Sequence, residues 1–68
     1  MATLRTFVLQ HPENLKWFFR VMEVVGQPNV EIDYHDESGR HFGIFVAKKF
    51  ARQLWIDRLD KNYIVCTK

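Results

Sequence analysis

The chain has 68 residues, of which 47% are hydrophobic and 15% aromatic, and its formal net charge is +2. This composition is too apolar for a disordered chain, and the length predicts a single domain over residues 1–68 with a thin core. No uncharged apolar run approaches the roughly 18 residues needed to cross a bilayer, which excludes a membrane span. With Cys66 as the lone cysteine and no recognisable secretory signal, we expect a cytoplasmic protein.

The first part of the chain predicts a strand followed by a helix. The aliphatic, aromatic and β-branched run Leu4–Leu9 is typical of a strand. Residues 11–13 (His-Pro-Glu) predict a helix start, because proline is tolerated in the first turn and the helix dipole favours an acidic residue there. Gly26, with Pro28 just beyond it, predicts the end of this helix.

The remainder predicts two strands, a second helix and a last strand. Residues 30–35 alternate apolar with polar side chains, and His41–Val46 continues as the next strand. Residues 47–61 carry apolar side chains at helical spacing, and Tyr63–Thr67 closes the chain as a β-rich run. The order βαββαβ predicts an α+β, ferredoxin-like sheet with both helices on one face. Gln53–Leu59 has an alternative interpretation as a strand that pairs with the last one.

The first predicted helix is more apolar than a sheet-covering helix needs to be. At about 100° per residue its apolar side chains span about 220°, whereas a surface helix needs a stripe of roughly 100°. The excess lies on a flank formed by Trp17, Val21 and Val24. Either the second helix packs there, or the flank contacts another chain, so these residues are candidates for a homodimer or partner interface.

Two registers are open to the hairpin around Gly39. A four-residue loop, Asp36–Gly39, pairs His35 with Arg40 and mixes apolar with polar side chains on both faces. A three-residue loop, 37–39, gives the pairs Asp36–Arg40, His35–His41, Tyr34–Phe42, Ile32–Ile44 and Val30–Val46. We favour the second register, because it gathers the apolar residues on one face and places Gly39 in the left-handed region.

Arg40–Val46 (RHFGIFV) resembles the third-strand motif of RNA-recognition motifs, in which a basic residue and alternate aromatics face the RNA. The resemblance implies single-stranded RNA or DNA binding by Arg40, Phe42 and Phe7, with Lys48, Lys49 and Arg52 nearby. In the favoured register, however, Phe42 and Ile44 face the core and the open face carries carboxylates that repel phosphate. Nucleic-acid binding is therefore the alternative interpretation.

The sequence shows no convincing catalytic or metal site. In the favoured register His35 and His41 are cross-strand neighbours with Asp33 on the same face, but spacing supplies no fourth ligand, and neither His11 nor Cys66 can be placed beside them. No phosphate loop or nucleophile motif is present, and Cys66 is expected to be a buried structural thiol. We therefore expect no enzymatic activity, no cofactor and no bound metal.

The remaining interpretation is a non-catalytic protein that binds another protein. The charges are segregated, because an acidic stretch precedes a basic C-terminal part. The predicted contact surface for a basic partner is an acidic strip with one neighbouring aromatic: Glu31, Asp33, Asp36, Glu37 and Phe45. Small cofactor-free proteins of this format include phage and mobile-element inhibitors of host enzymes or defence complexes, an analogy of size and composition alone.

Overall fold

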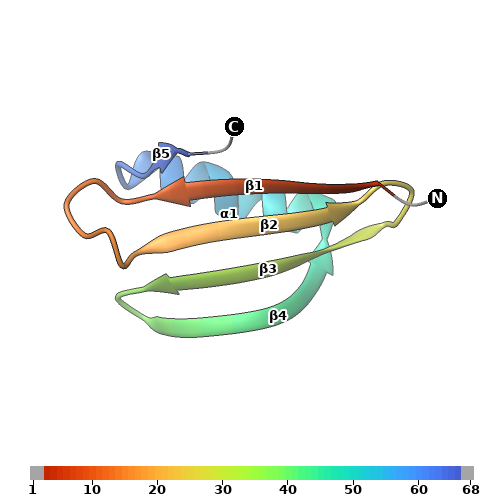
Figure 1. The fold of residues 1–68 in the computed structure, drawn as a ribbon, viewed down its shortest axis with the longest axis horizontal. Coiled ribbons are helices and arrows are strands. Elements are labelled where there is room, and N and C mark those ends of the chain that lie inside the picture. The colour runs from red at the N-terminus through yellow and green to blue at the C-terminus, as the bar shows by residue number, and fades with distance from the viewer. Residues whose placement is uncertain (1–2, 67–68) are drawn as a thin grey trace.

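The computed structural model describes residues 3–66 as five strands and one helix. The elements are β1 (Leu4–Gln10), β2 (Phe18–Val24), β3 (Asn29–Asp36), β4 (Gly39–Ala47), α1 (Lys48–Asp60) and β5 (Ile64–Val65). Neighbouring strands are antiparallel, in the order β4-β3-β2-β1-β5. In Figure 1, β1 to β4 form a meander and α1 lies behind the sheet, returning the chain to the β1 edge. One face of the sheet is therefore covered by the helix, and no described element covers the other.

The predicted βαββαβ fold with two helices is wrong, because residues 18–24 form strand β2 and not a helix. Along β2, Phe19 and Val21 point toward α1 and are buried, whereas Phe18 and Arg20 point to the opposite face. A strand with apolar side chains on both faces appears as an over-wide apolar arc when it is plotted as a helix. The arc of about 220° was therefore a sign of a strand with two apolar faces.

The expected helix start at residues 11–13 lies in the loop between β1 and β2. The His11 backbone N–H donates to the Trp17 carbonyl oxygen at 3.0 Å, and the Trp17 N–H donates to the Asn14 carbonyl oxygen at 2.9 Å. The Glu13 N–H donates to Nδ1 of His11 at 3.1 Å. These bonds give the polar backbone groups of residues 11–17 partners within the loop, so a helix is not needed to satisfy them.

The second predicted helix is confirmed as α1, and the alternative strand at Gln53–Leu59 is wrong. The helix ends at Asp60. Just beyond it, Asn62 takes the left-handed conformation with φ of 73°, and the Tyr63 N–H donates to the Arg58 carbonyl oxygen at 3.1 Å. The last strand is short, and Thr67 of the predicted strand lies outside the described residues. Within residues 3–66, no helix has the length and apolar character needed to cross a membrane.

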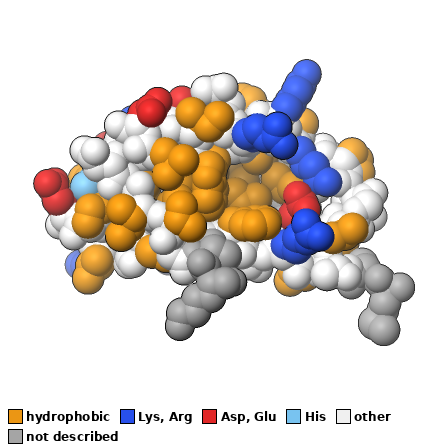
Figure 2. All heavy atoms as spheres, turned by 90° about the horizontal axis from the view of Figure 1, so that it is seen from above, with side chains coloured by type: hydrophobic (Ala, Val, Ile, Leu, Met, Phe, Trp, Pro, Cys, Tyr) orange, Lys and Arg blue, Asp and Glu red, His pale blue; other side chains and the backbone are white. Residues whose placement is uncertain are grey.

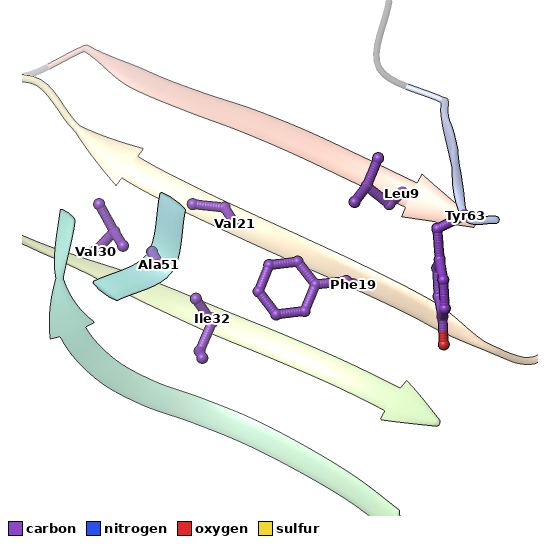
Figure 3. Packing of buried hydrophobic residues seen from close by; sticks show 7 residues of the cluster. All are labelled: Leu9, Phe19, Val21, Val30, Ile32, Ala51 and Tyr63. Atoms are coloured by element: carbon purple, nitrogen blue, oxygen red, sulfur yellow. The ribbon is translucent and has the colours of Figure 1, made fainter. Parts of the chain in front are cut away.

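The core lies between α1 and the face of the sheet that it covers, which we call the inner face. Phe19 is fully buried at its centre, with ring centroids 5.7 Å from Tyr34 and 6.4 Å from Trp55. Figure 3 shows the buried apolar side chains gathered over the sheet; they come from β1, β2, β3, the helix and the connection between α1 and β5. They are Leu9, Phe19, Val21, Val30, Ile32, Ala51 and Tyr63.

The β3–β4 hairpin uses both of the registers considered above, one on each side of an irregularity. Next to the turn the pairs are Asp36–Gly39, His35–Arg40 and Tyr34–His41. Farther from the turn they are Ile32–Ile44, Glu31–Phe45 and Val30–Val46. The favoured register is therefore right for the far half of the hairpin and wrong near the turn.

A β-bulge in β4 connects the two registers. Phe42 and Gly43 stand opposite the single residue Asp33, and Gly43 has φ of 59° in the left-handed region. Gly39 also has a positive φ, 118°, which confirms that glycine is used there for its backbone conformation. Because of the extra residue in β4, Phe42 is 60% exposed and does not enter the core.

Candidate functional site: the outer face of the sheet

The face of the sheet that points away from α1, called the outer face, is built by alternate residues of four strands. Its members follow from the strand pairing, since directly paired residues share a face. They are Leu4, Thr6, Val8 and Gln10 of β1, Phe18, Arg20, Met22 and Val24 of β2, Glu31, Asp33 and His35 of β3, and Arg40, Phe42 and Phe45 of β4. No described element packs over them.

An ion pair lies at the centre of the outer face. Arg20 donates through Nη2 to Oδ2 of Asp33, its direct neighbour on the adjacent strand. The Asp33 side chain is 1% exposed, whereas that of Arg20 is 39% exposed, with its guanidinium carbon 5.9 Å from the centroid of the Phe18 ring. The carboxylate is therefore enclosed by its neighbours and its charge is compensated within the chain.

Exposed aromatic side chains border this ion pair on β4. Phe45 is 68% exposed and Phe42 is 60% exposed. The guanidinium carbon of Arg40 lies 3.9 Å from the centroid of the Phe42 ring, which is a close cation–π contact. Aromatic residues and arginine are the types enriched at the energetic centres of protein interfaces. Chemically, this part of the face is suited to apolar and stacking contacts.

The structure divides the predicted acidic strip between the two faces of the sheet. Asp33 is buried in its pair with Arg20, and Glu31 is half-buried on the outer face. Asp36 belongs to the inner face, where it is buried against Arg58, and Glu37 lies in the turn with a carboxylate oxygen 3.8 Å from Nζ of Lys61. The four carboxylates therefore do not form one acidic surface. Glu31 and Phe45 lie on the outer face as expected, whereas Asp33 lies there but is buried.

The pair of Asp36 and Arg58 joins the helix to the β3–β4 hairpin. Arg58 donates through Nη2 to Oδ2 of Asp36 at 2.7 Å, and its guanidinium carbon lies 5.1 Å from the ring centroids of both Phe19 and Tyr34. Oδ1 of Asp36 accepts from the backbone N–H of Ser38 at 2.9 Å and from its hydroxyl at 2.6 Å.

The same contacts set the ionisation of this cluster. Burial acts to raise the pKa of Asp36, but the hydrogen bonds from Ser38 and the charges of Arg58 and Lys61 outweigh it and lower the pKa below 3.8. Burial, with a contribution from Asp36, raises the pKa of Tyr63 above 10.0. The bonds of Asp36 to Arg58 and Ser38 hold the helix to the hairpin, so we assign the cluster a structural role.

The predicted flank of Trp17, Val21 and Val24 does not exist as one surface. Trp17 lies in the loop before β2, with its ring 5.4 Å from that of His11. Val21 is buried in the core beneath α1, and Val24 lies on the outer face. The prediction failed because it rested on helical spacing in a segment that is partly loop and partly strand.

The histidines and the cysteine do not form the sites drawn from the sequence. His35 pairs with Arg40 and His41 with Tyr34, so the two imidazoles lie on opposite faces. Among residues 3–66, no group of three His, Cys, Asp or Glu side chains is placed to hold a metal ion. Cys66 is an exposed free cysteine, which corrects its expected burial; its short closing strand leaves it at the surface.

The residues of the nucleic-acid interpretation are separated as well. Phe42 and Arg40 are exposed together on the outer face, contrary to the predicted burial of Phe42. Phe7, however, points to the inner side, where its ring centroid lies 6.4 Å from that of Trp55. Lys48, Lys49 and Arg52 are on the first two turns of α1.

Sequence reasoning missed Phe18, Arg20 and Met22 as surface residues of the outer face. The signal was present, because apolar and charged residues alternate in part of Phe18–Val24, but a wide helical arc fits the same residues.

Comparison with known proteins identifies no matching family model, no similar curated protein and no similar solved structure.

Proposed function

We propose that this chain is a non-catalytic binding protein that contacts another protein through the outer face of its sheet. The observation that carries this proposal is the exposure of Phe42, which lies against Arg40, and of Phe45, on a sheet face that no described element covers. Contiguous apolar surface is uncommon on small monomeric proteins and marks interaction sites. That the partner is a host enzyme or defence complex, which this chain inhibits, stays a prediction.

The charges of the outer face favour an apolar contact over an acidic one. Asp33 is compensated by Arg20, and Arg40 stands on the same face as Glu31, so the face is close to neutral. A partner with a strongly basic surface would gain little from it, because charge complementarity requires an excess of one sign. We therefore place the centre of the contact at Phe42 and Phe45.

A matched pair of variants tests this assignment. Phe42→Ser/Phe45→Ser removes two exposed apolar side chains from the outer face, and Phe50→Ser/Ile56→Ser removes two, 55% and 43% exposed, from the helix. Each immobilised protein is incubated with an extract of its native host, after circular dichroism has shown that it folds. We expect a partner protein that is retained by the parent chain and the helix variant and lost by the outer-face variant. Retention of the same partner by the outer-face variant would contradict the proposal.

A homodimer through the same face is tested separately by sedimentation equilibrium. If the partner is a second copy, the parent chain sediments as a dimer at micromolar concentration and Phe42→Ser/Phe45→Ser sediments as a monomer. A parent chain that remains monomeric at high micromolar concentration excludes self-association as the use of this face and leaves a foreign protein as the partner.

Single-stranded RNA or DNA binding is the second candidate, because the contact of Arg40 with an exposed Phe42 is suited to stacking on a base. Nucleic-acid binding is less favoured than protein binding, because phosphate contacts dominate nucleic-acid affinity. The outer face is close to neutral, and the cations of α1 are distant from it. Fluorescence anisotropy with a labelled RNA 20-mer separates the two candidates. Tight binding that weakens steeply with salt and is abolished by Phe42→Ala would replace protein binding with nucleic-acid binding.

A further inference from the structure

A hollow on the opposite side of the molecule from the outer face has the chemistry of a small ligand site. It lies between α1, from Lys48 to Trp55, and the strands β1, β2 and β3, and has a volume of about 300 Å³. Figure 2 shows it as a depression with a hydrophobic floor, with basic side chains and one acidic side chain at one end. At about 30 Å³ per water molecule, the volume accommodates a ligand of roughly ten non-hydrogen atoms.

The floor and walls of the hollow are apolar. Val21, Val30 and Ala51 form its buried floor, at 9%, 2% and 3% exposure. Phe7 from the sheet and Trp55 from the helix also line the hollow and lie edge to face, with ring centroids 6.4 Å apart at an interplanar angle of 85°. The hollow therefore suits a hydrocarbon chain or ring more than a polar molecule.

The rim carries an excess of positive charge. Lys48 and Arg52, one helical turn apart, line the hollow together with Glu23 of β2. Nζ of Lys48 lies 3.8 Å from the Glu23 carboxylate, so that pair is largely self-compensating. The Arg52 side chain makes no hydrogen bond or ion pair with any residue in the described range 3–66. A free guanidinium beside an apolar hollow matches a carboxylate at the end of an apolar group.

The first turn of α1 also favours a negatively charged ligand group at this end of the hollow. The residue before the helix, Ala47, provides no side-chain hydrogen bond to the first-turn N–H groups, and no acidic residue occurs in that turn. The positive end of the helix dipole is therefore not offset by a side chain of the helix itself.

We propose that this hollow binds a small amphipathic monocarboxylate, with its apolar group against Val21, Ala51, Phe7 and Trp55 and its carboxylate at Arg52. This site does not depend on the proposed function, because it uses none of the outer-face residues. Octanoate, with ten non-hydrogen atoms, is the probe; a ligand of this size is expected to bind with a dissociation constant on the order of 1 mM.

The test is a titration of the full protein with each of three probes of the same hydrocarbon chain length, monitored by two-dimensional NMR. We expect octanoate to give saturable shifts at Phe7, Ala51 and Trp55, and 1-octanol and octylammonium to bind at least about tenfold more weakly, about 1.4 kcal/mol. Equal binding of the three probes would overturn the carboxylate assignment, and shifts that map outside the hollow, or none that saturate, would overturn the site.

Variants at the exposed Arg52 and Lys49 and at the half-buried Glu23 test the role of charge. Arg52→Gln should weaken octanoate binding several-fold, and Glu23→Gln should strengthen it because Lys48 is then released from its pair. Lys49→Gln is the matched control, since Lys49 is in the same turn of the helix but does not line the hollow. An effect of Lys49→Gln equal to that of Arg52→Gln would show general charge attraction and overturn the role of Arg52.

Discussion

The two faces of the sheet have similar apolar content but different neighbours. On the inner face, α1 covers Phe19 and Ile32 so completely that they are 0% and 2% exposed. On the outer face, Phe42 and Phe45 are more than half exposed. Each face also has one arginine–aspartate pair, Arg58–Asp36 inside and Arg20–Asp33 outside. The comparison teaches that apolar residues in this chain hold the fold on one face and are available for contact on the other.

Truncation of an aromatic on each face should show this difference most strongly. Phe19→Ala is expected to lower the free energy of unfolding by about 3–5 kcal/mol, because it leaves a cavity beneath α1 and removes the ring that lies against Arg58. Phe45→Ala should change it by less than about 0.5 kcal/mol, since the side chain is already in water. Urea denaturation of both variants measures these changes in the free energy of unfolding. Similar losses of stability for the two variants would show that the outer face is packed in solution.

The two ion pairs offer a second comparison of the faces. Arg58→Met leaves Asp36 buried without its partner and should cost about 3–5 kcal/mol. Arg20→Met should cost less, about 1–3 kcal/mol, because Arg20 is already partly hydrated and water can approach Asp33 when it is removed.

Two further variants control the ion-pair comparison. Lys61→Met removes only the exposed contact with Glu37 and should have little effect on the urea midpoint. Asp36→Asn in the Arg58→Met background should recover part of the lost stability, since it removes the unpaired buried charge. A larger loss for Arg20→Met than for Arg58→Met would reverse the assignment of the structural face.

The bulge that exposes Phe42 has its own test. Gly43→Ala should destabilise the fold by about 1 kcal/mol, because a φ of 59° is strained for alanine, while the added Cβ meets no atom within 4 Å. Gly43→Asn should cost less, since asparagine tolerates the left-handed region. Equal stability of the alanine variant and the parent chain in urea would indicate that the bulge is not held in solution.

The smallest expected effect is the pH dependence contributed by Asp36. Its pKa is lowered in the folded chain from 3.8, so its stabilising contribution is present above pH 3.8 and is lost as the pH falls through the folded value. The stability advantage of the parent chain over Asp36→Asn should therefore shrink as the pH is lowered from 5 to below 3. An advantage that is constant or grows toward low pH would contradict this linkage.

Several elements could be predicted from the sequence because their signals are local. Alternation along residues 30–35 identified β3, and the apolar spacing in residues 47–61 identified α1 within one residue at each end. The positive φ of Gly39 followed from the chemistry of short hairpin loops. In β3 one face is apolar and the other polar, so strand periodicity fits; in residues 47–61 helical spacing was the favoured of two interpretations.

The segment at residues 11–26 could not be predicted in the same way, and the candidate site depends on it. Phe18–Val24 is a central strand with apolar side chains on both faces, for which strand and helix periodicities fit equally well. Because the sequence predicts a helix where β2 lies, it does not place Arg20 opposite Asp33, and it predicts an exposed Asp33 carboxylate. Likewise, the extra residue at Gly43 is visible only when β4 is paired with β3, so the exposure of Phe42 was missed.

By itself the sequence determined the parts of this protein in which a residue's neighbours along the chain decide its environment: β1, β3, β4, α1 and the glycine at the hairpin turn. Only the tertiary structure decided the order of the strands, the identity of β2, the bulge, and therefore which aromatics and carboxylates are buried. The physical reason is that strand pairing and helix docking join residues far apart in sequence, and burial follows from those contacts and not from residue type.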